Sequence, residues 1–331
     1  MSWRGIHKYK FFCKNALPHK VYKLMQIEKE EMNQFNVHLA SHYGMCFGVR
    51  DALAATRKAY DENDVTVLGQ LVHNPLVSKE LTENGIREGD LDDSLMDVSG
   101  TVIITAHGVS GTDRSRWESP HRKVIDTTCP LVNKAHAALS SLIDLGFFPV
   151  VIGKKGHAEV NGLTGDYPQA IVIEREEDIS DVPHEGKVGV VSQTTQPIER
   201  VNELVEKIRS LRSSCEVRFI DTVCSPTKNR QRAVKDLAEI CDLIVVVGGS
   251  NSNNTSELVS AVEQLGVRAI QIERPEDLML DWFLGAKNVG VTAGTSTLNQ
   301  TVLGVSDRLR EMSKELMLKD RNLNGKEEIL C

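Results

Sequence analysis

Short runs of apolar residues alternate along the chain with longer amphipathic stretches. The runs 65–68 and 149–152 are each four residues long, and turns rich in glycine and polar residues follow them. Apolar runs of this length between helical stretches predict buried, mostly parallel β-strands connected by helices. We therefore expect an α/β fold. Because open α/β sheets bind ligands at the carboxyl ends of their strands, we expect the functional residues in the turns after the strands.

One unit of this pattern occurs three times, and each copy presents one cysteine. The cysteines stand at equivalent points of the copies, each before a predicted helix: Cys46, Cys129 and Cys224. Counted from its cysteine, His73 lies 27 residues later in the first copy, and His157 and Ser252 each lie 28 residues later in the other two. The repeat predicts three α/β units that share one centre: 36–122 with Cys46, 123–216 with Cys129 and 217–297 with Cys224.

The two ends of the chain differ from the repeats. Residues 1–27 contain no Asp or Glu, but they lack the Ser and Arg content of a transit peptide. We interpret 1–35 as a loosely ordered extension, or as an over-early start before Met25 or Met32, with an organelle-targeting segment as the alternative. We interpret 298–331 as an amphipathic helix to about residue 318, followed by a polar, frayed tail.

Composition and charge narrow the class of protein. The 331 residues are 40% hydrophobic and carry a formal net charge of −7, which describes a globular protein and argues against nucleic acid as the main partner. No apolar run approaches the roughly 18 residues that cross a bilayer, so we expect no membrane association. Seven cysteines without any CxxC pair favour a reducing, cytoplasmic location and exclude zinc ribbons, thioredoxin-like sites and the usual ferredoxin motifs.

Polar residues at the predicted strand ends indicate what the shared centre binds. Besides the three cysteines they comprise three histidines, one carboxylate and several neutral side chains: His73, His107, His157, Glu159, Thr194, Thr195, Ser252, Asn254 and Ser296. Neutral donors beside helix N-termini suit a phosphate or diphosphate, and the absence of Walker and G-x-G-x-x-G motifs argues against a nucleotide. Helix N-termini favour thiolates. Three thiolates suit either an iron–sulfur cluster with one open iron or zinc with an open position.

Eight motifs together resemble the 4-hydroxy-3-methylbut-2-enyl diphosphate reductase family. In chain order they are MCFGV, GQLVHNP, TAHGVS, DTTCPLV, GHAEVNG, SQTT, DTVCSPTKNRQ and the Ser-Asn loop after VVVGG. The resemblance implies three pseudo-threefold-related α/β units, with mostly parallel sheets, around a central iron–sulfur site. It also implies reduction of 4-hydroxy-3-methylbut-2-enyl diphosphate to isopentenyl and dimethylallyl diphosphate, the last step of the non-mevalonate isoprenoid pathway.

The resemblance further implies roles for individual residues. Cys46, Cys129 and Cys224 would hold one [4Fe–4S] cluster per chain, whose open apical iron would bind the substrate hydroxyl. Glu159 with Thr194 would pass the proton that lets this hydroxyl leave as water. The remaining polar residues would hold the diphosphate: His73, His107, His157, Thr194, Ser252, Asn253, Asn254 and Ser296. A ferredoxin or flavodoxin would supply the two electrons.

Three stretches depart from the family pattern. They are residues 41–45 before the first cysteine, Asn253 in place of a second serine, and Leu298-Asn299 in place of a Pro-Asp pair. These changes touch the expected pocket rim and one expected diphosphate contact. An iron–sulfur paralogue acting on a related phosphorylated substrate, a non-catalytic iron–sulfur module and a zinc-dependent hydrolase are the alternatives.

Overall fold

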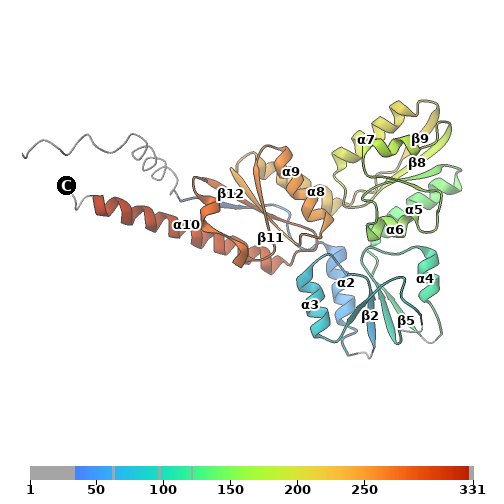
Figure 1. The fold of residues 1–331 in the computed structure, drawn as a ribbon, viewed down its shortest axis with the longest axis horizontal. Helices are drawn as coiled ribbons and strands as arrows, with labels where there is room; N and C mark the ends of the chain where they lie inside the picture. The colour runs from blue at the N-terminus through green and yellow to red at the C-terminus, as the bar shows by residue number, and fades with distance from the viewer. Residues whose placement is uncertain (1–33, 62–63, 96–97, 121, 328–331) are drawn as a thin grey trace, which may run out of the picture.

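The structure is a computed structural model that describes residues 34–61, 64–95, 98–120 and 122–327. Over these residues the chain forms three α/β lobes, each built on a four-stranded sheet (Figure 1). Neighbouring strands within each sheet are parallel. The expected three α/β units with parallel sheets are therefore confirmed. Over the same ranges, no helix combines the length and the apolar character needed to cross a membrane.

The first lobe has the strand order β3-β2-β4-β5. Its two middle strands are buried at every position, as expected for apolar runs inside a parallel sheet. Asn74 caps helix α3 (Pro75–Glu83), because its side chain accepts a hydrogen bond from the Leu76 N–H and Pro75 starts the first turn. The elements are α2 (Phe47–Arg57), β2 (Val65–Leu68), α3 (Pro75–Glu83), β3 (Arg87–Gly89), β4 (Thr101–Ile104), α4 (Gly111–Trp117) and β5 (Lys123–Asp126).

The second lobe has the equivalent order β7-β6-β8-β9. One apolar stripe of its last helix, with Val201, Leu204, Val205 and Ile208 at helical spacing, packs in the core against the sheet. The elements are α5 (Pro130–Asp144), β6 (Phe148–Ile152), α6 (Ala158–Thr164), β7 (Ile171–Ile173), the 3-10 helix η1 (Glu176–Asp181), β8 (Gly186–Ser192), α7 (Ile198–Leu211) and β9 (Cys215–Phe219).

The third lobe has the order β1-β12-β10-β11. The C-terminal helix packs on this sheet through the apolar residues expected from the sequence: Val302, Val305, Leu309, Met312 and Leu316. The elements are β1 (Asn36–Leu39), α8 (Ser225–Ala238), β10 (Leu243–Val247), α9 (Asn253–Gln264), β11 (Arg268–Ile272), η2 (Pro275–Asp277), η3 (Leu280–Phe283), β12 (Asn288–Ala293) and α10 (Asn299–Glu327).

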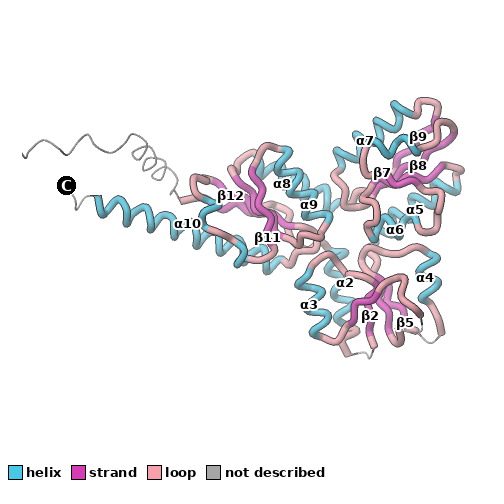
Figure 2. The backbone as a smooth tube through the Cα atoms, in the orientation of Figure 1, coloured by secondary structure: helices cyan, strands magenta, loops and turns pink. Residues whose placement is uncertain are grey.

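One edge strand of each sheet leads directly into the next lobe. Strand β5 pairs with β4, β9 with β8, and β1 with β12. The helices that follow these strands, α5, α8 and α2, pack in the cores of the second, third and first lobes respectively. The chain therefore crosses between lobes three times in a closed ring, and loops from the three lobes meet at the centre (Figure 2).

The sheets consequently divide the chain differently from the expected boundaries. The expected boundaries place β1 in one unit with α2 and β5 in one unit with α5, and they cut through β9. The expected units are 36–122, 123–216 and 217–297. Hydrogen bonding instead places β5, β9 and β1 in the sheets of the preceding lobes. The repeat read from the sequence starts at the strand before each cysteine, whereas sheet membership depends on backbone pairing with another segment, which leaves no local pattern.

Both ends of the described chain extend the fold beyond the expected limits. Phe35 is buried; its N–H donates to the Ser313 hydroxyl at 3.1 Å, and that hydroxyl donates to the Phe35 carbonyl at 2.6 Å. Helix α10 continues to Glu327 instead of ending near residue 318. Residues 1–33 and 328–331, which include Cys13, Cys331 and most of the expected N-terminal extension, lie outside the described residues.

Candidate active site

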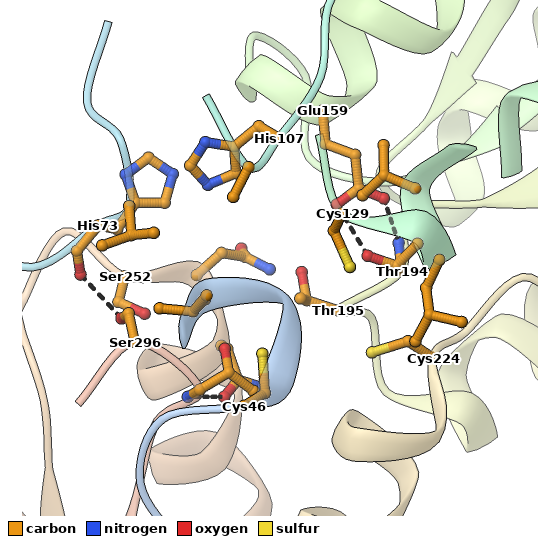
Figure 3. Close-up of a pocket in the computed structure, with 18 of the residues that line it drawn as sticks. Cys46, His73, His107, Cys129, Glu159, Thr194, Thr195, Cys224, Ser252 and Ser296 are labelled. Carbon is orange, nitrogen blue, oxygen red and sulfur yellow. Dashed lines mark hydrogen bonds between the residues drawn. The ribbon is translucent and has the colours of Figure 1, made fainter. Parts of the chain in front are cut away.

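A pocket lies where the three lobes meet, and side chains from all three line it (Figure 3). The twelve residues expected from the sequence all line this one pocket: Cys46, His73, His107, Cys129, His157, Glu159, Thr194, Cys224, Ser252, Asn253, Asn254 and Ser296. They come from loops and helix starts at the carboxyl ends of the strands, where ligands of parallel sheets bind. The tertiary structure therefore brings the whole predicted set together.

Each of the three cysteines is the N-cap residue of a crossover helix. Cys46 precedes α2, Cys129 precedes α5 and Cys224 precedes α8. Each cysteine N–H donates to a backbone carbonyl that follows a strand of the preceding lobe. Cys46 donates to Thr295, after β12, at 2.9 Å. Cys129 donates to Ala106, after β4, at 3.1 Å, and Cys224 donates to Thr194, after β8, at 2.9 Å. These equivalent bonds fix the three thiols at equivalent positions around the pocket.

Burial and neighbouring acidic groups disfavour the thiolate forms of Cys129 and Cys224. Burial raises the pKa of Cys129 and raises that of Cys224 to about 11, and the Glu159 carboxyl and the Cys46 thiol add to both increases. Hydrogen bonds from the first turns of the helices act in the opposite direction but are outweighed. A positively charged group beside Cys129 and Cys224 would therefore stabilise their thiolates.

Cys215 and Cys241 lie away from the pocket. The Cys215 thiol donates to the Pro183 carbonyl at 3.4 Å, and Cys241 is buried in the core of the third lobe.

Glu159 lies in the first turn of α6 and is fully enclosed, with 2% of its surface exposed. Its Oε1 accepts the Thr194 N–H at 2.5 Å, and its Oε2 accepts the Thr194 hydroxyl at 2.9 Å. Burial raises the pKa of Glu159 to about 7, against the smaller opposing effect of the two bonds to Thr194. Among the described residues no lysine or arginine forms an ion pair with it. At neutral pH this carboxyl therefore carries a proton for a large part of the time.

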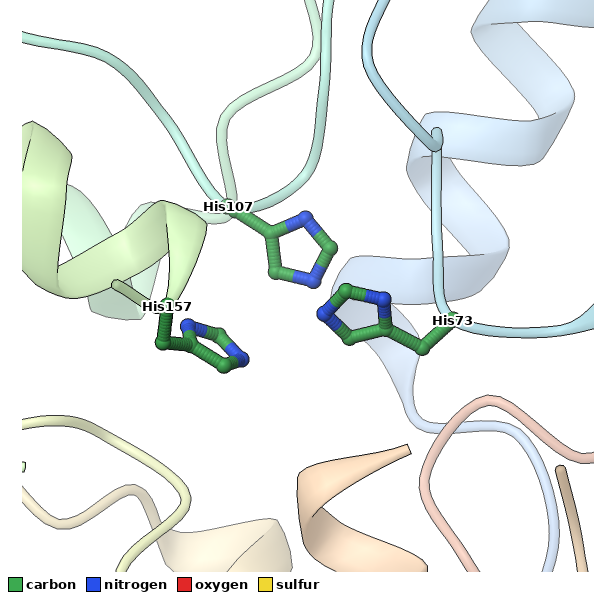
Figure 4. Close-up of side chains that lie close together, drawn as sticks. All are labelled: His73, His107 and His157. Atoms are coloured by element: carbon green, nitrogen blue, oxygen red, sulfur yellow. The ribbon is translucent and has the colours of Figure 1, made fainter. Parts of the chain in front are cut away.

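Three imidazoles face one another on the other side of the pocket (Figure 4). The ring centroids of His73 and His107 lie 4.4 Å apart. The centroid of the His157 ring lies 5.2 Å from that of His73 and 5.4 Å from that of His107. Burial lowers the pKa of all three, to about 4 for His157. The three rings are thus neutral at pH 7.

A hydrogen bond assigns the ring proton of one of these histidines. The Glu159 N–H donates to His157 Nδ1 at 3.1 Å, so the neutral His157 ring carries its proton on Nε2. His73 Nδ1 lies 3.1 Å from Gln70 Oε1, and which of the two ring nitrogens carries the proton depends on the tautomer. The His73 Nε2 atom is buried without a partner among the described residues. Such an orphaned atom indicates a ligand in the pocket.

The third lobe contributes neutral polar groups. Ser252 is the N-cap of α9, and the Asn253 Nδ2 donor is buried without a partner among the described residues. The Asn254 Oδ1 accepts the Thr295 N–H at 2.9 Å, and the Ser296 hydroxyl donates to the His73 carbonyl at 3.0 Å. The last bond connects the third lobe to the first across the pocket.

Sequence reasoning missed three residues that support the site. Asn74 donates to the Ser296 carbonyl at 2.6 Å, and its N-cap position before a proline was a usable signal. Asn299 accepts the Met45 N–H at 3.1 Å, so two of the stretches that depart from the family pattern contact each other. Arg230 is buried beside the cysteine loops, and its position on a helix offered no signal.

Relatives with known names match most of the chain. A family model described as LytB protein matches residues 37–310. A 4-hydroxy-3-methylbut-2-enyl diphosphate reductase of Aquifex aeolicus (strain VF5) is 36% identical over 292 residues, covering 84% of this chain and 96% of the relative. A protein of the same name from Pelobacter propionicus is 38% identical over 285 residues, covering 84% of this chain and 99% of the relative.

Solved structures agree with these matches. The E-1-hydroxy-2-methyl-but-2-enyl-4-diphosphate reductase from Plasmodium falciparum superposes with a TM-score of 0.76 at 28% identity, covering 82% of this chain and 86% of that one. A structure of (E)-4-hydroxy-3-methyl-but-2-enyl diphosphate reductase superposes with a TM-score of 0.61 at 35% identity, covering 83% of this chain and 99% of that one. The family match and the shared three-lobed fold show that this chain belongs to the LytB family of oxidoreductases.

Proposed function

We propose that this chain reduces 4-hydroxy-3-methylbut-2-enyl diphosphate to isopentenyl and dimethylallyl diphosphate. The reaction consumes two electrons and two protons: one proton leaves with the hydroxyl as water, and the other ends on a carbon of the product. The observation that carries the proposal is the pocket itself, in which three N-cap cysteines, one buried carboxyl and three neutral histidines from three lobes face one space. The names of the relatives supply the substrate. The pocket offers the three functions that this reduction needs: a metal site, a proton donor and an anion site.

The three thiols fit an iron–sulfur cluster. Burial disfavours the charged forms of Cys129 and Cys224, and a cation beside these two cysteines would stabilise their thiolates. We propose that Cys46, Cys129 and Cys224 hold one [4Fe–4S] cluster per chain and leave one iron open. Such a group, when bound, supplies electrons together with a Lewis acid for the departing oxygen.

Glu159 is the proposed proton donor. Its Oε1 accepts the Thr194 N–H, which leaves Oε2 to carry the proton beside the Thr194 hydroxyl. A carboxyl with a pKa of about 7 is protonated often enough at neutral pH to act as a general acid. The Thr194 hydroxyl can accept this proton and donate its own toward the pocket, so the pair moves one proton to the leaving hydroxyl.

The diphosphate would lie between the histidines and the loop at the start of α9. The His157 Nε2–H and the Asn253 Nδ2 donor are available to phosphate oxygens. The N-termini of α3, α6 and α9 lie beside these residues and favour an anion. We propose contacts from His73, His107, His157, Thr194, Ser252, Asn253, Asn254 and Ser296. The two electrons would come from a ferredoxin or flavodoxin in the cytoplasm.

Metal analysis and turnover of anaerobically purified protein test the proposal. We expect about four irons and four acid-labile sulfides per chain, and conversion of 4-hydroxy-3-methylbut-2-enyl diphosphate to both products with a chemical reductant. Zinc without sulfide would contradict the cluster and favour a hydrolase. Iron and sulfide without turnover of this substrate would contradict the proposed reaction and favour a paralogue or a non-catalytic module.

A further inference from the structure

Arg230 is a buried arginine that connects the helix capped by Cys224 to the loop that precedes Cys46. It lies on α8, the helix that Cys224 caps, and 5% of it is exposed. Its Nη1 donates to the Pro226 carbonyl at 2.9 Å, and its Nη2 donates to the Gly44 carbonyl. Gly44 lies two residues before Cys46. The guanidinium therefore spans from the helix of one thiol to the loop of another.

The charge of this guanidinium lacks an ordinary counter-ion. Both of its hydrogen-bond acceptors are neutral carbonyls, and its Nε is buried without a partner among the described residues. Within the described part of the chain no carboxylate forms an ion pair with Arg230. A buried guanidinium remains charged, and a buried charge without an opposite charge is strongly destabilising.

The acidic groups that act on Arg230 are the thiols. Burial lowers the pKa of Arg230, whereas Cys46 and Cys224 raise it and the nearby Arg50 lowers it further. Thiolates at these two cysteines would supply the missing counter-charge. Arg230 in turn acts on the thiols, because a fixed cation near the two cysteines favours the deprotonated sulfur that binds metal.

We propose that Arg230 is a positioning residue that balances the negative charge of the Cys46 and Cys224 thiolates and thereby raises the reduction potential of the cluster they hold. This inference rests on the proposed function, because it requires the cluster. Reduction adds one electron from an external reductant to a site that already contains three thiolates. A buried cation stabilises the more negative, reduced form, and net charge around a cluster is one of the factors that set its potential.

Hydrogen bonding gives Arg230 a second, separable effect on geometry. Gly44 has a φ of +68°, a conformation that favours glycine, and the next residue, Met45, donates its N–H to Asn299. Arg230 and Asn299 thus hold the Cys46 loop from two sides. Arg230→Lys keeps the positive charge and loses the two-pronged donor, whereas Arg230→Gln loses the charge and keeps one donor. The two variants therefore distinguish charge from geometry.

The test is a redox titration of the reconstituted holoenzyme, followed by the cluster's absorption and electron paramagnetic resonance spectra. We expect Arg230→Gln to lower the ratio of reduced to oxidised cluster roughly tenfold at a fixed solution potential, which is about 59 mV for a one-electron couple. Arg230→Lys should restore most of this ratio. Arg232→Gln is the matched control, since Arg232 is exposed on the same helix and should leave the potential unchanged.

Each outcome decides the inference. A wild-type potential in Arg230→Gln with full iron and sulfide content would overturn it. If Arg230→Gln folds but does not retain the cluster, retention by Arg230→Lys supports the charge role, and loss in both variants overturns it in favour of hydrogen bonding alone. Absence of iron and sulfide from the wild-type protein would instead overturn the proposed function, so the two failures are distinguishable.

Discussion

At the scale of single residues, surroundings rather than residue type assign the roles. Glu80 forms an ion pair with Arg57 at 2.8 Å, and this hydrogen-bonded cation lowers the pKa of Glu80. Glu159 is enclosed without a cation, and burial raises its pKa to about 7. The two glutamates therefore differ in the protonation state that they hold at neutral pH. That difference supports the proposed role of Glu159 as the proton donor.

Replacing Glu159 with Gln should remove turnover while the substrate still binds. Glutamine keeps the size of the side chain and can still accept the Thr194 N–H, but it has no acidic proton. We expect the rate of reduction to fall by a factor of about 10² or more. Steady-state kinetics with a chemical reductant, together with substrate-induced changes in the cluster spectrum, measure the two effects separately.

Two variants control this experiment. His73→Ala should mainly weaken substrate binding, because it removes a proposed phosphate contact that would be made in both the ground and transition states. Glu80→Gln, at a partly exposed ion pair with Arg57, should leave both parameters nearly unchanged. Wild-type turnover in Glu159→Gln would mean that the proton comes from Thr194 or from the diphosphate itself.

The same carboxyl predicts a pH dependence. Because its pKa lies near 7, Glu159 is protonated and able to donate below pH 7 and loses that proton as the pH rises through 7. The rate of the reductive step should therefore be constant at lower pH and fall about tenfold per unit at higher pH. Single-turnover rates between pH 6 and 9, with cluster reduction measured separately at each pH, test this expectation. A rate that rises with pH through 7 would contradict it.

At the scale of elements, the start of a helix is the unit from which the site is built. Cysteines cap α2, α5 and α8, and Asn74, His157 and Ser252 cap α3, α6 and α9. All six helix starts face the same centre, because each helix follows a parallel strand. Their free N–H groups and dipoles favour negative charge at both the thiols and the proposed diphosphate.

Gly48→Ala tests how closely two of these helix starts approach each other. A Cβ on Gly48, in the first turn of α2, would overlap the Cys129 sulfur. Alanine favours a helix over glycine by up to about 1 kcal/mol, so the variant should fold. It should nevertheless bind at least about twofold less iron per chain, because the added methyl group would overpack a proposed cluster ligand at a cost of roughly 1–3 kcal/mol.

Gly304→Ala is the matched control for this substitution. Gly304 also lies inside a helix, and its nearest neighbour would be Pro275 Cγ at 3.3 Å, far from the pocket. Iron content and circular dichroism of the two variants should be compared. Equal iron content in both would show that the contact between Gly48 and Cys129 relaxes without cost.

At the scale of the whole molecule, the closed ring of three crossovers creates the site. The crossovers follow β1, β5 and β9, and each contributes one cysteine from a different lobe. No lobe contains the proposed cluster site by itself. Loss of any one thiol should therefore prevent binding of the proposed cluster rather than weaken one lobe.

Alanine substitutions of cysteines test this whole-molecule property. Cys46→Ala, Cys129→Ala and Cys224→Ala should each abolish the brown colour and the bound sulfide, because two thiolates do not retain the cluster. Cys241→Ala is the control, since Cys241 is equally a free cysteine but lies in the core of the third lobe. A folded but colourless Cys241→Ala protein would contradict the assignment of ligands.

Local patterns in the sequence were sufficient for most of the elements and for the list of site residues. The apolar runs at β2 and β6 and the helical stripe of α10 were predictable because each depends on neighbours within a few positions along the chain. The cysteines were identified by repetition, since a threefold repeat places equivalent residues at equivalent points. The twelve predicted site residues accordingly line one pocket.

Only the tertiary structure decided which strands share a sheet and how the site residues are charged. Strand β1 pairs with β12, and Phe35 bonds to Ser313, although these partners lie at opposite ends of the chain. Arg230 contacts the loop of Cys46 in the same non-local way. The raised pKa of Glu159 and the lowered pKa of His157 depend on burial in the assembled pocket. Backbone pairing and desolvation are set by whichever distant segments come into contact, so no local pattern of residues records them.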